Sequence, residues 1–240
     1  MALLVSQAAN AVTTVATKLG TTIEAKHRNV LIDILTTSLA GRTWNGKDKV
    51  LKALASICKN SKEVLVSDPS VEVKSIVDAL IKEARKDETV YKTASLQSLG
   101  DVLESLDIDR FEDVYVIVRE LFHQNGSEAK DDDVVSPSEL AKKREDSTKL
   151  REVAFETLGK AWPMNSKATQ EKYREVLVEQ ITECLPKSSR SVQACIVSAL
   201  YSYVDKLSLL DEEELDVNNR QILNNIIDNI LKTLNFSFSK

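Results

Sequence analysis

The sequence predicts an all-α protein, an α-solenoid of stacked helix pairs, and three observations support this prediction. Glycine and proline are scarce, with 6 and 4 among 240 residues, so few residues are present that interrupt helices. Apolar residues recur at helical spacing along most of the chain, and strand-like alternation is nowhere sustained. A short residue pattern also returns about every 42 positions, which indicates an internal repeat.

About ten amphipathic helices of roughly 12–20 residues are expected in order along the chain. Apolar residues fall on one helical face over residues 73–84, 111–122, 173–185 and 222–234. Prolines and short polar stretches mark the ends of helices around residues 68–70, 106–109, 162–165 and 185–188. Because proline lacks the backbone N–H and cannot continue a helix, it separates neighbouring helices at three of these four breaks.

Every second expected helix carries one signature: a small residue, three further positions, and then two apolar or small residues. The signature starts at intervals of 42, 42, 59 and 41 residues, at Ala11, Ala53, Ser95, Ala154 and Cys195. The long interval contains the polar stretch "NGSEAKDDDVVSPS", and removing about 17 residues there restores the period. A period near 40 with two helices per unit is typical of HEAT repeats.

The sequence therefore predicts one array of about five HEAT-like (ARM-type) repeats with an acidic insertion loop at residues 125–138. The repeats are expected over residues 1–40, 41–87, 88–124, 139–186 and 187–240. Small residues at fixed signature positions would let neighbouring helices approach closely, and larger apolar residues would fill the layer between repeats. Leu99 and Leu158 are expected in that layer.

Bulk composition restricts the classes of partner. The net charge of −5 argues against general nucleic-acid binding, although a local basic patch is compatible with it. No apolar run approaches the roughly 18 residues of a membrane span, so no membrane insertion is expected. The three cysteines, Cys58, Cys184 and Cys195, are widely spaced and suit reduced thiols in a core. We therefore expect a protein of the cytoplasm and nucleus.

The stretch "GRTWNGKD", residues 41–48, fits the phosphate-binding pattern G-x-x-x-x-G-K except at its last position, where Asp48 replaces Ser or Thr. A phosphate loop follows a strand, whereas the residues before Gly41 have helical spacing. The competing interpretation is a helix junction. In it, Gly41 ends one helix in a left-handed conformation, Thr43 caps the next helix, and Asp48 lies in its first turn.

Three large side chains of this stretch need a further explanation. Arg42, Trp44 and Lys47 either seal the junction between repeats or form part of a protein-contact surface, since Trp and Arg are common at interfaces. No catalytic, cofactor-binding or metal-binding residue is singled out. The two histidines, His27 and His123, lack metal-ligand spacing, and the acidic runs at 131–133 and 211–214 suit solvated loops.

Residues 39–65, "LAGRTWNGKDKVLKALASICKNSKEVL", resemble a segment near the C-terminal end of the proteasome adaptor and scaffold proteins, a family of large HEAT-repeat proteins. Gly41, Arg42, Trp44, Gly46 and Lys47 are among the residues that match the family's "GRTW-x-GK" pattern. The resemblance implies a C-terminal portion of a much longer α-solenoid. It further implies binding to the 26S proteasome, with contacts to both the regulatory and the core particle, and no catalytic site.

We therefore expect a non-catalytic scaffold or adaptor, without a cofactor, that helps to tether or regulate the two proteasome particles. One alternative is a HEAT scaffold of another complex, of the transport or phosphatase-regulatory type. A less favoured alternative is a nucleotide hydrolase that uses the loop from Gly41 to Lys47.

Overall fold

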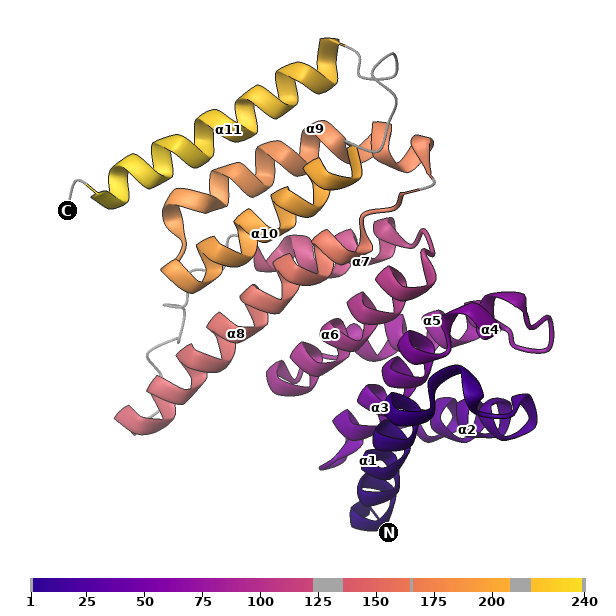
Figure 1. Cartoon of the computed structure of the whole chain (residues 1–240). Coiled ribbons are helices and arrows are strands. Elements are labelled where there is room, and N and C mark those ends of the chain that lie inside the picture. Colours follow the sequence, from indigo (N-terminus) through magenta and orange to yellow (C-terminus); the bar gives the residue numbers. More distant parts are fainter. Residues whose placement is uncertain (1, 123–135, 165, 208–216, 239–240) are drawn as a thin grey trace. The chain divides into compact units, whose positions relative to one another are not determined.

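The computed structural model describes residues 2–122, 136–164, 166–207 and 217–238, and every element in these ranges is a helix (Figure 1). The chain divides into two compact units, Met1–Ile108 and Asp109–Lys240. The predicted all-α class is confirmed. None of the described helices combines the length and the apolar character that crossing a bilayer requires.

Unit 1 holds two layers of helices. The signature helices α1 (Ala2–Leu19), α3 (Lys47–Asn60) and α6 (Thr89–Leu106) pack side by side in that order. The second layer contains α2 (Ala25–Ser38), which packs on α3, and α5 (Val73–Ala84), which packs on α6. Short elements connect these helices, namely the 3-10 turn η1 (Gly20–Thr22) and α4 (Lys62–Ser67).

Unit 2 repeats the pairing of signature helices. Helix α8 (Pro137–Ala161) packs along α10 (Arg190–Leu207), and α7 (Phe111–Val118) packs on α8. Helix α11 (Val217–Phe238) contacts both α9 (Lys167–Cys184) and α10. The remaining elements are the 3-10 turns η2 (Arg119–Leu121) and η3 (Leu185–Lys187).

The small residues of the signature act as expected where α8 meets α10. A Cβ atom on Gly159 would lie 2.9 Å from the Cα atom of Ala199, so only glycine permits this approach of the two helices. Leu99 and Leu158 are buried, as the repeat register predicts. The α8–α10 contact therefore depends on side-chain size at the signature positions.

Aromatic rings fill the core of unit 2. Trp162 follows the end of α8 and meets Phe111 edge-on at 5.0 Å between centroids and Tyr203 at 4.8 Å. The Lys206 ammonium donates hydrogen bonds to the carbonyls of Gly159, Lys160 and Trp162, at 3.3, 3.3 and 2.5 Å. A cation at this position complements the negative end of a helix, so Lys206 fixes the end of α8 over the aromatic core.

The start of α8 and the described ranges bear on the insertion loop and the acidic runs expected from the sequence. Helix α8 begins at Pro137, where Ser136 and Glu139 form a capping box. Most of the expected insertion loop at 125–138 lies outside the described residues, as do His123 and the acidic runs at 131–133 and 211–214. The boundaries of the five repeats stay a prediction.

Replacing Leu158 by alanine tests the packing of unit 2. Because Leu158 is only 1% exposed, Leu158→Ala should lower the free energy of unfolding by about 2–5 kcal/mol, measured by urea denaturation. Leu231→Ala removes the same atoms from a side chain that is 50% exposed, and should change stability by less than about 0.5 kcal/mol. Equal effects of the two substitutions would contradict the register.

Candidate functional site

The junction before α3 is built around two glycines with left-handed backbones. Gly46 precedes α3 with a φ of 97°, and a Cβ atom there would lie 2.8 Å from Ser6 Oγ of α1. The expected cap at Thr43 is wrong, because the helix starts four residues later, at Lys47, and Gly46 occupies the cap position. Gly41 has a φ of 82° but lies two residues beyond Leu39, the C-cap of α2. Asp48 lies in the first turn of α3, as expected.

Lys47 is fully buried and forms an ion pair with Glu83 of α5, with 2.9 Å between Nζ and Oε2. The same carboxylate oxygen accepts hydrogen bonds from Lys86 Nζ at 2.6 Å and from the Tyr91 hydroxyl at 2.6 Å. We call these four residues, Lys47, Glu83, Lys86 and Tyr91, the Glu83 cluster. It joins α3, α5 and α6, since each contributes one member and Lys86 lies between the last two.

The environment of the cluster sets its protonation. Burial alone would raise the pKa of Glu83, but the hydrogen bonds from Lys86, Tyr91 and Lys47 hold it below the ordinary value. Burial also lowers the pKa of Lys47, as does the neighbouring Lys86, while Glu83 acts in the opposite direction. Burial and the adjacent carboxylate raise the pKa of Tyr91. The tyrosine therefore remains a hydrogen-bond donor to a charged carboxylate.

The cluster also holds the preceding turn. Lys86 Nζ donates to the Gly41 carbonyl at 2.9 Å, and Lys47 Nζ lies 3.4 Å from the carbonyls of Gly41 and Arg42. The lysine that a phosphate loop would direct toward its ligand therefore points into the protein and binds its own turn. The element before the loop is a helix, α2, where a phosphate loop needs a strand. This geometry favours the junction interpretation over a nucleotide site.

The structure separates the three residues singled out in the sequence. Lys47 is buried in the Glu83 cluster, Trp44 is half-buried, and Arg42 is exposed. The Trp44 ring packs over the turn, 3.5 Å from where a Cβ atom of Gly46 would lie. A contact role for Arg42 and Trp44 stays a prediction, whereas Lys47 has no surface to offer.

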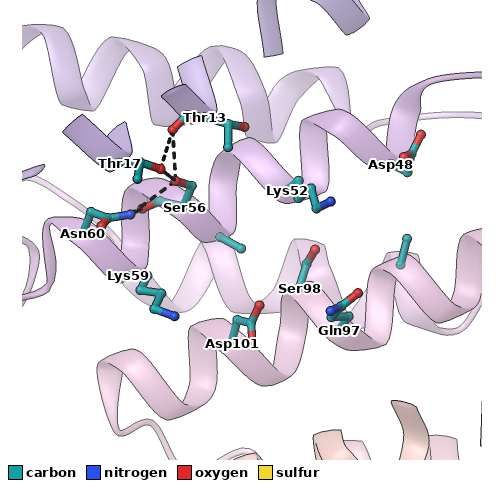
Figure 2. A pocket seen from close by; sticks show the side chains of 12 residues that line it. Thr13, Thr17, Asp48, Lys52, Ser56, Lys59, Asn60, Gln97, Ser98 and Asp101 are labelled. Atoms are coloured by element: carbon teal, nitrogen blue, oxygen red, sulfur yellow. Dashed lines mark hydrogen bonds between the residues drawn. The ribbon is translucent and has the colours of Figure 1, made fainter. Parts of the chain in front are cut away.

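A polar groove of about 340 Å³ crosses the signature helices of unit 1. Figure 2 shows the lining residues of α3, such as Lys52 and Ser56, between those of α1 and those of α6. The residues that line it are Thr13, Thr17, Asp48, Lys52, Ala55, Ser56, Lys59, Asn60, Ala94, Gln97, Ser98 and Asp101. Ten of these twelve side chains are polar or charged, but apolar atoms contribute the larger share of the lining surface, so the groove offers apolar contact as well as hydrogen bonds and charge.

Hydrogen bonds fix the α1–α3 end of the polar groove. Ser56 Oγ lies 3.3 Å from both the Thr13 carbonyl and Thr17 Oγ1, and Asn60 Nδ2 donates to the Ser56 carbonyl at 2.8 Å. The two bonds of Ser56 connect α3 to α1 over 39 to 43 positions of sequence, and the Asn60 bond lies within α3. The wall of the groove is thus set before any partner arrives.

Two lysines and two aspartates, Asp48 and Asp101, carry the charges of the groove, and the lysines are the more exposed. Lys52 and Lys59 are exposed and lie seven residues apart on α3, about 10 Å along the helix axis. Within the described ranges neither lysine has an ion-pair partner, whereas Asp48 pairs with Lys49 at 2.9 Å. Sequence reasoning missed this groove, and the spacing of the two lysines was its only local signal.

Nothing in the described residues points to chemical catalysis. Burial raises the pKa of the Cys58 thiol to about 12, and burial and Glu156 raise that of Cys195 to about 11, so neither thiol is an activated nucleophile. In the same part of the chain, no three His, Cys, Asp or Glu side chains gather as a metal site would require. The arrangement of the described residues can hold another protein.

Comparisons with known proteins agree with the sequence resemblance. Residues 58–239 match the family model described as "ECM29, C-terminal ARM-like repeats". The chain is 38% identical over 216 residues to the "Proteasome-associated protein ECM29 homolog" of Drosophila melanogaster, which covers 86% of this chain and 11% of that protein. It is 33% identical over 198 residues to the "Proteasome adapter and scaffold protein ECM29" of Homo sapiens, covering 78% and 10%.

No solved structure matches the chain. The chain spans about a tenth of the length of the two curated relatives.

Removing the charge of Glu83 should destabilise unit 1. Glu83→Gln leaves the Lys47 ammonium buried without its counter-ion, so we expect a loss of about 3–5 kcal/mol in chemical unfolding. Adding Lys47→Met should recover part of that loss, because the buried charge is then gone. Glu104→Gln on the exposed face of α6 is the matched control and should be nearly neutral. A neutral Glu83→Gln would show that the cluster is dispensable.

The stabilisation from Glu83 should also depend on pH. Because the pKa of Glu83 is lowered in the folded protein, its contribution is complete above the ordinary value of 4.5 and is lost as pH falls through the lowered value. The stability difference between the wild type and Glu83→Gln should therefore be constant near neutral pH and shrink in acid. Thermal unfolding from pH 7 to 3 measures it, and a difference that grows in acid would contradict the assignment.

Proposed function

The chain belongs to the ECM29 family, and on that premise we propose that it is a non-catalytic scaffold segment that binds the 26S proteasome. In this proposal it helps to tether or regulate the core and regulatory particles. The observation that carries the proposal is the match over most of the chain to relatives named as proteasome-associated, adapter and scaffold proteins. The match covers only about a tenth of each relative's length, so the segment would supply one part of a larger contact.

The geometry supports a binding role in two ways. The charged residues of the Glu83 cluster pair with one another and hold α3 and α5 together, so they do not face a ligand. The accessible polar groups instead line an open groove across three signature helices. A rigid helical surface with fixed polar walls suits recognition of another protein.

We propose the polar groove of unit 1 as a proteasome-contacting surface. Lys52 and Lys59 would attract a surface that carries carboxylates, and the hydroxyls and amides of the walls would fix its orientation. The exposed Arg42 and the half-buried Trp44 form a second candidate contact at the turn before α3. We also propose a cytoplasmic and nuclear location, which suits the reduced thiols of Cys58, Cys184 and Cys195.

Binding of the purified chain to purified 26S proteasome tests both the proteasome role of the chain and the place of its contact surface. We expect the wild type to bind in a surface-immobilised assay, and Lys52→Glu with Lys59→Glu to weaken binding at least about tenfold by reversing the attraction. Lys74→Glu with Lys82→Glu changes the same number of exposed charges on α5 and should bind normally.

Three results would change the conclusions. Absence of wild-type binding would overturn the proteasome role of this segment and favour a scaffold for another complex. Normal binding by the Lys52 and Lys59 variant would remove the polar groove from the contact. If Arg42→Ala with Trp44→Ala then abolished binding, the turn before α3 would be the contact surface instead.

A further inference from the structure

Three cationic side chains are buried in the described part of the chain, and one of them has no carboxylate partner there. Arg28 pairs with Asp68 at 2.7 Å, and Lys47 pairs with Glu83 at 2.9 Å. Arg151 of α8 is only 8% exposed, yet its hydrogen bonds go to uncharged oxygens. Because an arginine stays charged and buried charges are normally paired, this guanidinium calls for an anion.

Uncharged groups surround the Arg151 guanidinium. Its Nη2 atom donates to the Phe122 carbonyl at 3.2 Å and to Ser188 Oγ at 3.1 Å. Its Nε atom is buried and has no hydrogen-bond partner among the described residues. Burial lowers the pKa of Arg151, and the described group that acts in the opposite direction is the Cys184 thiol rather than a carboxylate. Within the described ranges Arg151 therefore lacks a counter-ion.

Ser188 is the partly accessible group in contact with this cation. It is half-buried and lies in the link between η3 and α10, where Lys187 and Arg190 are exposed. Neither of these two basic residues forms an ion pair within the part of the chain that the structure describes. The Ser188 hydroxyl donates to the Cys184 carbonyl at 2.7 Å and accepts from Arg151. An anion attached to this hydroxyl would meet the guanidinium directly.

We propose that Ser188 is a phosphorylation site and that its phosphate is the counter-ion of Arg151. A protein kinase would transfer the γ-phosphoryl group of a nucleoside triphosphate to Ser188 Oγ. The new bond joins Oγ to phosphorus, the bond from phosphorus to the β,γ-bridging oxygen breaks, and a base of the kinase takes the hydroxyl proton. The nucleoside diphosphate leaves.

The exchange of contacts favours the phosphate. Phosphorylation removes the neutral hydrogen bond from Ser188 to the Cys184 carbonyl, but bonds between a phosphate and an arginine are roughly twice as strong as neutral ones. The phosphate also stands two residues before Arg190, the first residue of α10. The start of a helix attracts negative charge, so the modification would fix the end of α9, the buried side of α8 and the start of α10 together.

The neighbouring serines lack this setting. Ser189 Oγ lies 3.3 Å from Ser191 Oγ, and both residues are exposed. Ser191 hydrogen-bonds to the Glu152 carboxylate, which would repel a phosphate. Ser189 precedes the same helix without contacting a buried cation, and it therefore serves as the matched control.

Phosphoserine incorporated at position 188 of the 240-residue chain tests the pairing. We expect the melting temperature to rise by at least about 2–4 °C relative to the unmodified chain. In Arg151→Met the same modification should give no rise, and in Arg151→Lys it should give part of it, because the charge is kept. Phosphoserine at position 189 should have an effect that Arg151→Met does not change.

A phosphorus NMR titration gives a second readout that loss of packing alone would not move. The second pKa of phosphoserine is ordinarily about 6, and a neighbouring guanidinium should lower it by at least about half a unit at position 188. Arg151→Met should restore the ordinary value. Position 189 should titrate alike in both backgrounds.

Incubation of the unmodified chain with a cell extract and ATP tests whether a kinase accepts the site. Mass spectrometry should locate phosphate on Ser188 and find none at that position in Ser188→Ala. A chain that gains no phosphate at Ser188 would overturn the proposal. So would a phosphoserine at position 188 that lowers the melting temperature, or one whose titration is the same with and without Arg151.

Discussion

The carboxylate of Glu83 is the constraint on which the arrangement of unit 1 depends. A buried carboxylate must be compensated by donors, and its donors come from α3, α6 and the link between α5 and α6. The pairing fixes the rotation of α3 about its axis. With Lys47 turned inward, Asp48, Lys52 and Lys59 are directed to the other side, where they line the polar groove. The position of the accessible surface is therefore a consequence of a buried ion pair.

Local patterns in the sequence predicted the helices and the order in which they pack. Helical spacing of apolar residues and the scarcity of glycine predicted the all-α class, and the recurring small residues predicted close helix contacts such as that at Gly159. These features are visible in sequence because they depend on neighbours within one or two turns, or on a period that repeats. The start of α3 was misplaced because Gly46, rather than a hydroxyl side chain, precedes it.

The role of Lys47 and the polar groove needed the folded structure. Glu83 lies 36 positions after Lys47, and no local pattern indicates which of the chain's 37 acidic residues would meet a given lysine. The groove is assembled from three helices, each of which contributes side chains that look like ordinary polar surface in sequence. Only packing shows that they share one space, and the same limit applies to the partly buried position of Trp44.

The close approach of Gly159 and Ala199 joins two unlike faces, and this gives the stack a direction. A contact between unlike faces is heterologous, and it cannot be reproduced by two identical faces meeting across a two-fold axis. The size of the side chains therefore determines which face of one helix meets which face of the next, because α8 contributes glycine to this contact and α10 contributes a methyl group. The two ends of such a stack are therefore unlike, and each end presents a different face, as in a polar filament.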